Sequence, residues 1–168
     1  MDSQTLRALQ APLKAKYKEH PESAIVTHHA EAKLGENITA ELKTKTGTLI
    51  AGLHPAAGGS GAESCSGDML LEAIVACAGV TMNAVATSMG LNIRSAKIIA
   101  DGDLDFRGTL GVSKEVPVGF KNIRLMYELD TDATDEQVAS LVKLTERYCV
   151  VFQTLKNPPE ISVLLKTS

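Results

Sequence analysis

Two cysteines of this sequence lie in apolar segments, where a thiol has two possible roles. Cys77 lies within "SGDMLLEAIVACAGV", residues 66–80, and Cys149 follows "LVKLTERY". The first role is packing, because a free cysteine is often fully buried and behaves as a small hydrophobic side chain. The second is redox chemistry, in which a thiolate attacks an O–O bond and becomes a sulfenic acid, and a second thiol converts it to a disulfide. The two segments by themselves leave both roles open.

Redox chemistry would require a charged or polar neighbour for the reactive thiol. Burial alone raises a thiol pKa, so a cation or hydrogen-bond donor must lie within about 4–6 Å to favour the thiolate. The candidate suppliers are His28, His29, Lys33 and Arg107.

A carboxylate that assists Cys77 would best be Asp68, in the first turn of the same predicted helix. The two residues are nine positions apart, which is roughly 13–14 Å along a helix axis. Asp68 would therefore act through an intervening cation or from the helix of a partner subunit.

Periodicity and turn residues predict the elements that position these side chains. The capping-box pattern "TDEQ" at residues 134–137 opens the last helix, which we expect to continue to Pro158. Helices are predicted at 3–18, from Ser66 to Gly90 and after Thr134, and strands at 24–30, 37–44, 48–53, 96–104, 121–129 and 160–166. This order predicts an α+β fold in one domain, residues 1–168, with residues 1–20 as a helical extension.

The long helix after Ser66 carries apolar residues on all sides, which indicates burial on most sides. Ala73, Cys77 and Thr81 add a row of small side chains that lets another backbone approach. A single domain of this length has few elements to wrap such a helix, so we expect an intertwined homodimer. Glu72 and several polar residues argue against a membrane span.

Composition excludes several classes of partner. The net charge is −3, aromatic residues make up 4% of the chain and tryptophan is absent, so we expect no nucleic-acid partner. The polar, amphipathic start lacks the apolar core of a signal peptide, which favours a cytoplasmic protein.

Metal binding is the weakest of the functional hypotheses. The sequence has no CxxC or HExxH motif, and His28 and His29 would point to opposite faces of a strand. His54 and Cys65 lie in a small-residue loop, residues 54–67. A metal site that uses Cys65, Cys77, His54 or a flanking histidine is the third hypothesis. We expect no metal and no cofactor, and we expect Cys65 to be dispensable.

"SGDMLLEAIVACAG" and "ERYCVVFQTL" resemble the two cysteine segments of the OsmC/Ohr family of bacterial thiol peroxidases. The resemblance implies an intertwined dimer whose antiparallel sheets wrap around long central helices. It implies that Cys77 is the peroxidatic thiol and Cys149 the resolving thiol. It further implies organic hydroperoxides as substrates and a dithiol reductant, such as a protein-bound lipoyl group.

The family pattern also includes an activating Arg–Glu pair, and the sequence differs there. Gly67 stands at the Glu position with Asp68 next to it, and the N-terminal strand region offers histidines and Lys33 where the Arg is expected. Cys149 is followed by Val150 where Pro is common. A non-catalytic binder of a small molecule or lipid-like ligand is therefore the alternative hypothesis, which the missing Arg and Glu favour and the cysteine pair disfavours.

Overall fold

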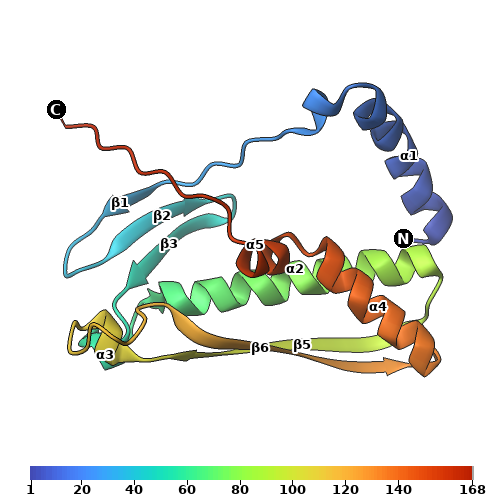
Figure 1. Cartoon of the computed structure of the whole chain (residues 1–168). Coiled ribbons are helices and arrows are strands. Elements are labelled where there is room, and N and C mark those ends of the chain that lie inside the picture. Colours follow the sequence, from blue (N-terminus) through green and yellow to red (C-terminus); the bar gives the residue numbers. More distant parts are fainter. Residues whose placement is uncertain (168) are drawn as a thin grey trace.

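A long apolar helix runs through the middle of the molecule. In the computed structural model, which describes residues 1–167, helix α2 (Ser66–Met89) lies between the remaining elements (Figure 1). Asp68 lies in its first turn, where a negative charge complements the helix dipole. Gly90 ends it with φ 68°, a left-handed conformation that favours glycine. The predicted helix is confirmed, with Cys65 rather than Ser66 as its N-cap.

The other elements surround α2 in chain order. The helices are α1 (Ser3–Glu19), α3 (Phe106–Thr109), α4 (Asp135–Tyr148) and α5 (Val150–Lys156), with short 3₁₀ helices η1 (Pro21–Ala24) and η2 (Pro55–Ala57). The strands are β1 (Ala32–Leu34), β2 (Ala40–Thr44), β3 (Gly47–Gly52), β4 (Ser64–Cys65), β5 (Ile93–Leu104) and β6 (Phe120–Thr131). This content confirms the α+β class.

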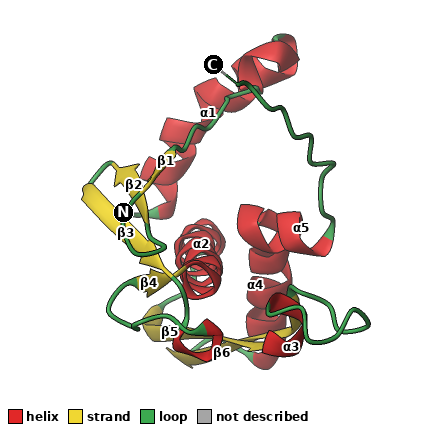
Figure 2. Cartoon of the chain, turned by 90° about the vertical axis from the view of Figure 1, so that its left-hand side faces the viewer, coloured by secondary structure: helices red, strands yellow, loops and turns green. Residues whose placement is uncertain are grey.

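Two sheets lie on different sides of α2. The first has the order β1-β2-β3-β4, antiparallel except for the short parallel pair β3–β4, which joins Gly52 to Cys65. The second is the long antiparallel pair β5–β6, with Ile98 opposite Tyr127. Viewed along α2, the first sheet lies on one side, β5 and β6 lie below, and α4 and α5 lie on the other side (Figure 2).

The core forms where α2 packs against α4. The buried residues of α2 recur every fourth position, as expected for one helix face: Ile74, Ala78, Met82 and Ala86. The facing residues are Leu141, Thr145 and Cys149, each at most 1% exposed. The Thr145 hydroxyl donates to the Leu141 carbonyl oxygen at 2.8 Å, so burial leaves it no unpaired donor.

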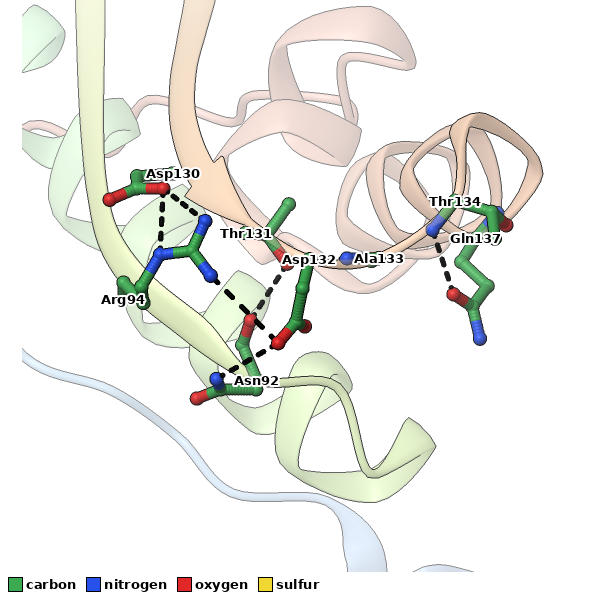
Figure 3. Close-up of polar contacts among 8 residues, drawn as sticks. All are labelled: Asn92, Arg94, Asp130, Thr131, Asp132, Ala133, Thr134 and Gln137. Carbon is green, nitrogen blue, oxygen red and sulfur yellow. Dashed lines mark hydrogen bonds and ion pairs between the residues drawn. The ribbon is translucent and has the colours of Figure 1, made fainter.

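The far end of the β5–β6 pair is held by polar contacts beside the start of α4. Arg94 Nε donates to Asp130 Oδ1 at 2.8 Å, and the Thr131 hydroxyl donates to the Asn92 carbonyl at 2.7 Å (Figure 3). Arg94 and Asp130 are about half exposed, so this ion pair contributes little to stability and mainly orients the strand ends.

The predicted capping box at the start of α4 is confirmed. Thr134 Oγ1 accepts from the Gln137 backbone N–H at 3.3 Å, and the Gln137 side chain accepts from the Thr134 N–H at 2.9 Å (Figure 3). These two bonds fix where α4 begins, and α4 in turn carries the chain to Cys149.

Three predicted strands differ from the structure. Residues 25–30 have no strand partner, and the strand predicted at 37–44 begins at Ala40 because Asn37 and Ile38 adopt positive φ angles of 54° and 62°. Residues 160–166 run away from α5 without joining either sheet (Figure 1). A strand is stable only where a neighbouring edge pairs with its backbone, and neither of these two terminal segments pairs with a strand of this chain.

The last predicted helix is in fact two helices. Cys149 has φ −72° and ψ 108°, an extended conformation that ends α4 and caps α5. The chain therefore restarts a helix at Val150, and this break determines the surroundings of the Cys149 thiol.

Apolar surface on α2 remains uncovered. Of the described helices, α2 alone is long and apolar enough to cross a membrane by length and composition, and only 28% of its most apolar window is buried. Val80 is 74% exposed. The core helix of a soluble protein meets the same criteria, and here β5, α4, α5 and α1 all contact α2.

Truncation at the α2–α4 contact should be costly. Leu141 is fully buried, so Leu141→Ala should lower the free energy of unfolding by about 2–5 kcal/mol. Lys143→Ala, at an exposed position of the same helix, should change it by less than about 0.5 kcal/mol. Urea denaturation at one protein concentration compares the two, and equal effects would contradict this account of the core.

Candidate functional site

The structure brings the Cys77 and Cys149 thiols together. Cys77 lies in the middle of α2, and Cys149 lies at the junction of α4 and α5, both of which contact α2. Each thiol affects the pKa of the other. No disulfide joins them, and both are free thiols.

Hydrogen-bond donors favour the thiolate form of Cys77. Burial raises the pKa of this thiol, but the backbone N–H of Val151, the Cys149 thiol, the Thr81 hydroxyl and the Val150 N–H all lower it. The donors outweigh burial, and the pKa of Cys77 lies below its ordinary value.

The Cys149 thiol has the opposite shift. Burial raises its pKa, the N–H groups of Phe152 and Val151 lower it less, and the neighbouring Cys77 raises it further. The pKa of Cys149 therefore lies above its ordinary value. Only one of two adjacent thiols can readily ionise, because two thiolates repel.

Solvent exposure also differs between the two thiols, and the thiol with the lower pKa is the more exposed one. Cys149 is 1% exposed, whereas Cys77 is partly exposed. The thiol that ionises more readily is thus also the one that a dissolved molecule reaches. A nucleophile requires this combination, and a packing residue does not.

The backbone N–H donors near the two thiols are available because the helix is interrupted at Cys149. The first N–H groups of any helix have no partner within the helix, and at α5 these belong to Val150, Val151 and Phe152. They interact with the two sulfur atoms. Thr81 joins them because it lies one turn after Cys77 on the same face of α2.

Sequence reasoning missed these donors. Thr81 was visible in the row of small residues that contains Cys77, but its hydroxyl was not considered as a donor. The helix break carries no local signal, since neither Gly nor Pro adjoins Cys149. The backbone N–H groups of α5 could therefore not be identified beforehand.

Arg107, one of the proposed cations, is paired elsewhere. Its Nε donates to Asp105 Oδ1 at 2.9 Å and its Nη2 to Asp105 Oδ2 at 2.6 Å. The guanidinium lowers the pKa of Asp105 to about 2. Within one chain, Arg107 is not among the main groups that shift the pKa of Cys77.

The other residues proposed to assist Cys77 are also not among the main groups that shift its pKa. His28 and His29 lie in the exposed segment before β1, and His29 approaches Glu31 at 3.9 Å. Lys33 is exposed on β1. Asp68 lines a surface hollow with Leu71, Glu72, Val75 and residues of β5, at the start of α2.

His54 and Cys65 have local roles in the fold. The His54 ring stacks on Phe106 with centroids 4.8 Å apart, and its Nδ1 accepts from the Ala56 N–H at 3.0 Å. Cys65 occupies the N-cap position of α2, without a capping hydrogen bond from its side chain, and ends the short strand β4. Among residues 1–167, no group of three or more His, Cys, Asp or Glu side chains is arranged to hold a metal ion.

Comparison with known proteins gives a family. The family described as "OsmC-like protein" matches residues 59–164, which is more than half of the chain and includes both Cys77 and Cys149. This chain belongs to the OsmC-like family. No curated protein matches this OsmC-like chain.

Solved structures show the same fold. The chain is similar to an OsmC-like protein from Mycoplasma pneumoniae, with a TM-score of 0.67, 15% identity, and coverage of 79% of this chain and 89% of that one. It is also similar to organic hydroperoxide resistance proteins. The one from Elizabethkingia anophelis has 13% identity, coverage of 79% and 91%, and a TM-score of 0.62. The one from Legionella pneumophila has 16% identity, coverage of 79% and 93%, and a TM-score of 0.62.

The opposite pKa shifts predict unequal alkylation of the two thiols. Because the pKa of Cys77 is lowered and that of Cys149 raised, iodoacetamide should modify Cys77 with a half-maximal rate at a lower pH than Cys149. Mass spectrometry of a Cys65→Ser protein, alkylated across a pH series, measures both rates. Thr81→Val should move the Cys77 midpoint to higher pH, and Thr81→Ser should leave it nearly unchanged. The reverse order of the two cysteines would refute the electrostatic account.

Proposed function

We propose that this OsmC-like protein is a thiol-dependent peroxidase that reduces organic hydroperoxides, with Cys77 as the peroxidatic and Cys149 as the resolving thiol. The observation that carries the proposal is the pair of adjacent thiols with opposite pKa shifts at the start of α5. Hydroperoxide resistance, stated for two structural neighbours, agrees with it.

The first step is a nucleophilic attack. The Cys77 thiolate attacks the terminal oxygen of the hydroperoxide, the O–O bond breaks, and the departing alkoxide takes a proton from solvent to become an alcohol. The sulfur is oxidised by two electrons and becomes a sulfenic acid. The donors that favour the thiolate before the attack are the N–H groups of α5 and the Thr81 hydroxyl.

The second step forms the disulfide. A neutral Cys77 sulfenic acid no longer carries the thiolate charge that opposes ionisation of Cys149. Cys149 then loses its proton more readily and attacks the Cys77 sulfur, and hydroxide leaves as water after taking a proton. The order of events therefore follows from the coupling between the two thiols.

A dithiol reductant completes the cycle. Its two thiols exchange with the Cys77–Cys149 disulfide, give up two electrons and two protons, and become a disulfide themselves. A protein-bound lipoyl group has this chemistry. We propose no cofactor and no metal for the reaction.

The proposal also covers the domain organisation, the cellular location and the oligomeric state of the protein. We infer that residues 1–168 form a single OsmC-like domain with residues 1–20 as an extension, working in the cytoplasm as an intertwined homodimer, without nucleic-acid or membrane partners. The uncovered side of α2 supports a dimer, as do Ile161, Val163, Leu164 and Leu165, each more than 80% exposed. A second copy would cover α2 and pair with residues 160–166.

The residues proposed to assist Cys77 could do so only from the partner subunit; they are Asp68, His28, His29, Lys33 and Arg107. Because none of them is among the main influences on Cys77 within one chain, any contribution to thiolate formation would cross the dimer interface. The backbone donors and Thr81 already favour the thiolate without them.

Peroxide should close the cysteine pair. Addition of cumene hydroperoxide to the reduced protein should give a Cys77–Cys149 disulfide that dithiothreitol reopens, as read by mass spectrometry. Cys77→Ser should abolish turnover, while Cys149→Ser should leave a sulfenic acid at Cys77 that dimedone traps. Cys65→Ser is the matched control and should retain activity. If both thiols stay free after peroxide treatment, the ligand-binding alternative replaces the peroxidase.

The dimer has its own test. Sedimentation velocity at micromolar concentration should give the mass of two chains, because the apolar side chains of α2 and of the terminal segment that are exposed in one chain become buried only on association. Val80→Glu places a charge on the uncovered side of α2 and should weaken association, whereas Val112→Glu, at a similarly exposed site outside α2, should not. A folded monomer of the unmodified chain would disprove the dimer.

A further inference from the structure

The resolving step forms a negative charge at a place that solvent hardly reaches. Cys149 is 1% exposed, so a thiolate there needs hydrogen-bond donors from the protein itself. The backbone N–H groups of Phe152 and Val151 are two such donors. The Val151 N–H also acts on Cys77, so the two sulfur atoms share it. A further donor that acts on Cys149 alone would therefore favour its ionisation.

One buried hydroxyl is available as such a donor. Among residues 1–167, the Tyr127 hydroxyl is the only buried side-chain polar atom without a hydrogen-bond partner. An unpaired buried donor costs free energy, and most buried polar groups in native proteins are paired. The contacts that hold the fold together do not use this hydroxyl, and neither do the reaction steps described above.

Tyr127 lies on the inner face of β6, beside the face of α4 that leads to Cys149. Residues of β6 alternate between exposed and half-buried around Tyr127, which is on the half-buried side. Its side chain packs against the core cluster that contains Leu141. Leu141, Thr145 and Cys149 recur every fourth position and share one side of α4. The same face of α4 thus meets Tyr127 and ends at the resolving thiol.

Electrostatic interactions indicate that the hydroxyl is close to Cys149. Burial raises the pKa of Tyr127 to about 12, and the charges of Glu146 and Cys149 contribute to the increase. The hydroxyl therefore keeps its proton at neutral pH and can act as a donor there. Cys149 is then surrounded by Cys77 on α2, the N–H groups of α5, Glu146 on α4 and Tyr127 on β6. Of these groups, Glu146 is the one that competes with Cys149 for the Tyr127 proton.

We propose that Tyr127 is a further catalytic residue of the resolving step, in which its hydroxyl donates a hydrogen bond to the Cys149 sulfur as that thiol loses its proton. The proposal rests on the peroxidase function. The S–S bond forms as the S–O bond of the Cys77 sulfenic acid breaks, and the Cys149 proton leaves with the hydroxide as water. Tyr127 keeps its own proton throughout, so it stabilises the charge and is neither oxidised nor reduced.

Removal of the hydroxyl alone tests this role. Tyr127→Phe keeps the ring and removes an unpaired donor, so the protein should remain folded. After cumene hydroperoxide is mixed with the reduced protein, rapid quenching and mass spectrometry follow the Cys77 sulfenic acid and the disulfide separately. The sulfenic acid should form at the wild-type rate, and the disulfide roughly ten-fold more slowly, as expected for a lost hydrogen bond to a charged group.

Tyr17→Phe is the matched control, because it removes the same hydroxyl from α1. It should change neither rate. Equal rates of disulfide formation in the wild type and in Tyr127→Phe would overturn the proposal and leave the peroxidase function intact.

An alkylation measurement tests the same hydrogen bond without peroxide. In a protein with Cys65→Ser and Cys77→Ser, Cys149 is the only thiol. Tyr127→Phe should raise the pH midpoint of its iodoacetamide modification by roughly one unit, because a lost donor disfavours the thiolate. An unchanged midpoint would show that the hydroxyl serves another acceptor, such as Glu146, and would reject the proposal. A raised midpoint in a protein whose wild type forms no disulfide with peroxide would confirm the hydrogen bond but reject the peroxidase function, and with it the resolving role.

Discussion

The placement of the start of α5 against the middle of α2 determines the surroundings of the two thiols. The N–H groups that α5 cannot satisfy internally interact with Cys77 and Cys149, and α2 holds Cys77 where they reach it. The contacts that hold α4 in place also help to position the two thiols, because α4 determines where α5 begins. The capping box at Thr134 and the fully buried Leu141 therefore act on the thiols from a distance.

This arrangement shows how a thiolate can be favoured without a paired cation. A guanidinium beside a sulfur supplies one full charge, whereas helix N–H groups and a hydroxyl supply several partial charges that are already oriented. Their effect depends on geometry more than on ionic strength, since short-range donors in a partly buried site are little screened by salt. In this OsmC-like chain the groups that lower the pKa of Cys77 within one subunit are the backbone N–H groups of Val151 and Val150, the Cys149 thiol and the Thr81 hydroxyl.

The sequence predicted the long helix and the long strands well and the surroundings of the two thiols poorly, for physical reasons. The pattern of apolar residues predicted helix α2 and the strands β5 and β6, and Gly90 predicted where α2 ends. The structure contains these elements nearly as expected. The cysteine pair was identified through a family resemblance. The break at Cys149 was not predicted, because a helix can end where tertiary packing requires it without Gly or Pro. The segments 24–30 and 160–166 failed as strands because strand formation depends on a neighbouring edge that a sequence pattern does not contain.

The extended segment after α5 has a consequence for handling the protein. An unpaired backbone next to exposed Ile161, Val163, Leu164 and Leu165 is the kind of edge from which β-aggregates grow. Association of two chains would hide that edge, and dilution would expose it again. Colloidal stability should therefore be greatest in solutions concentrated enough to keep the chains together, contrary to the usual advice to dilute a protein that precipitates.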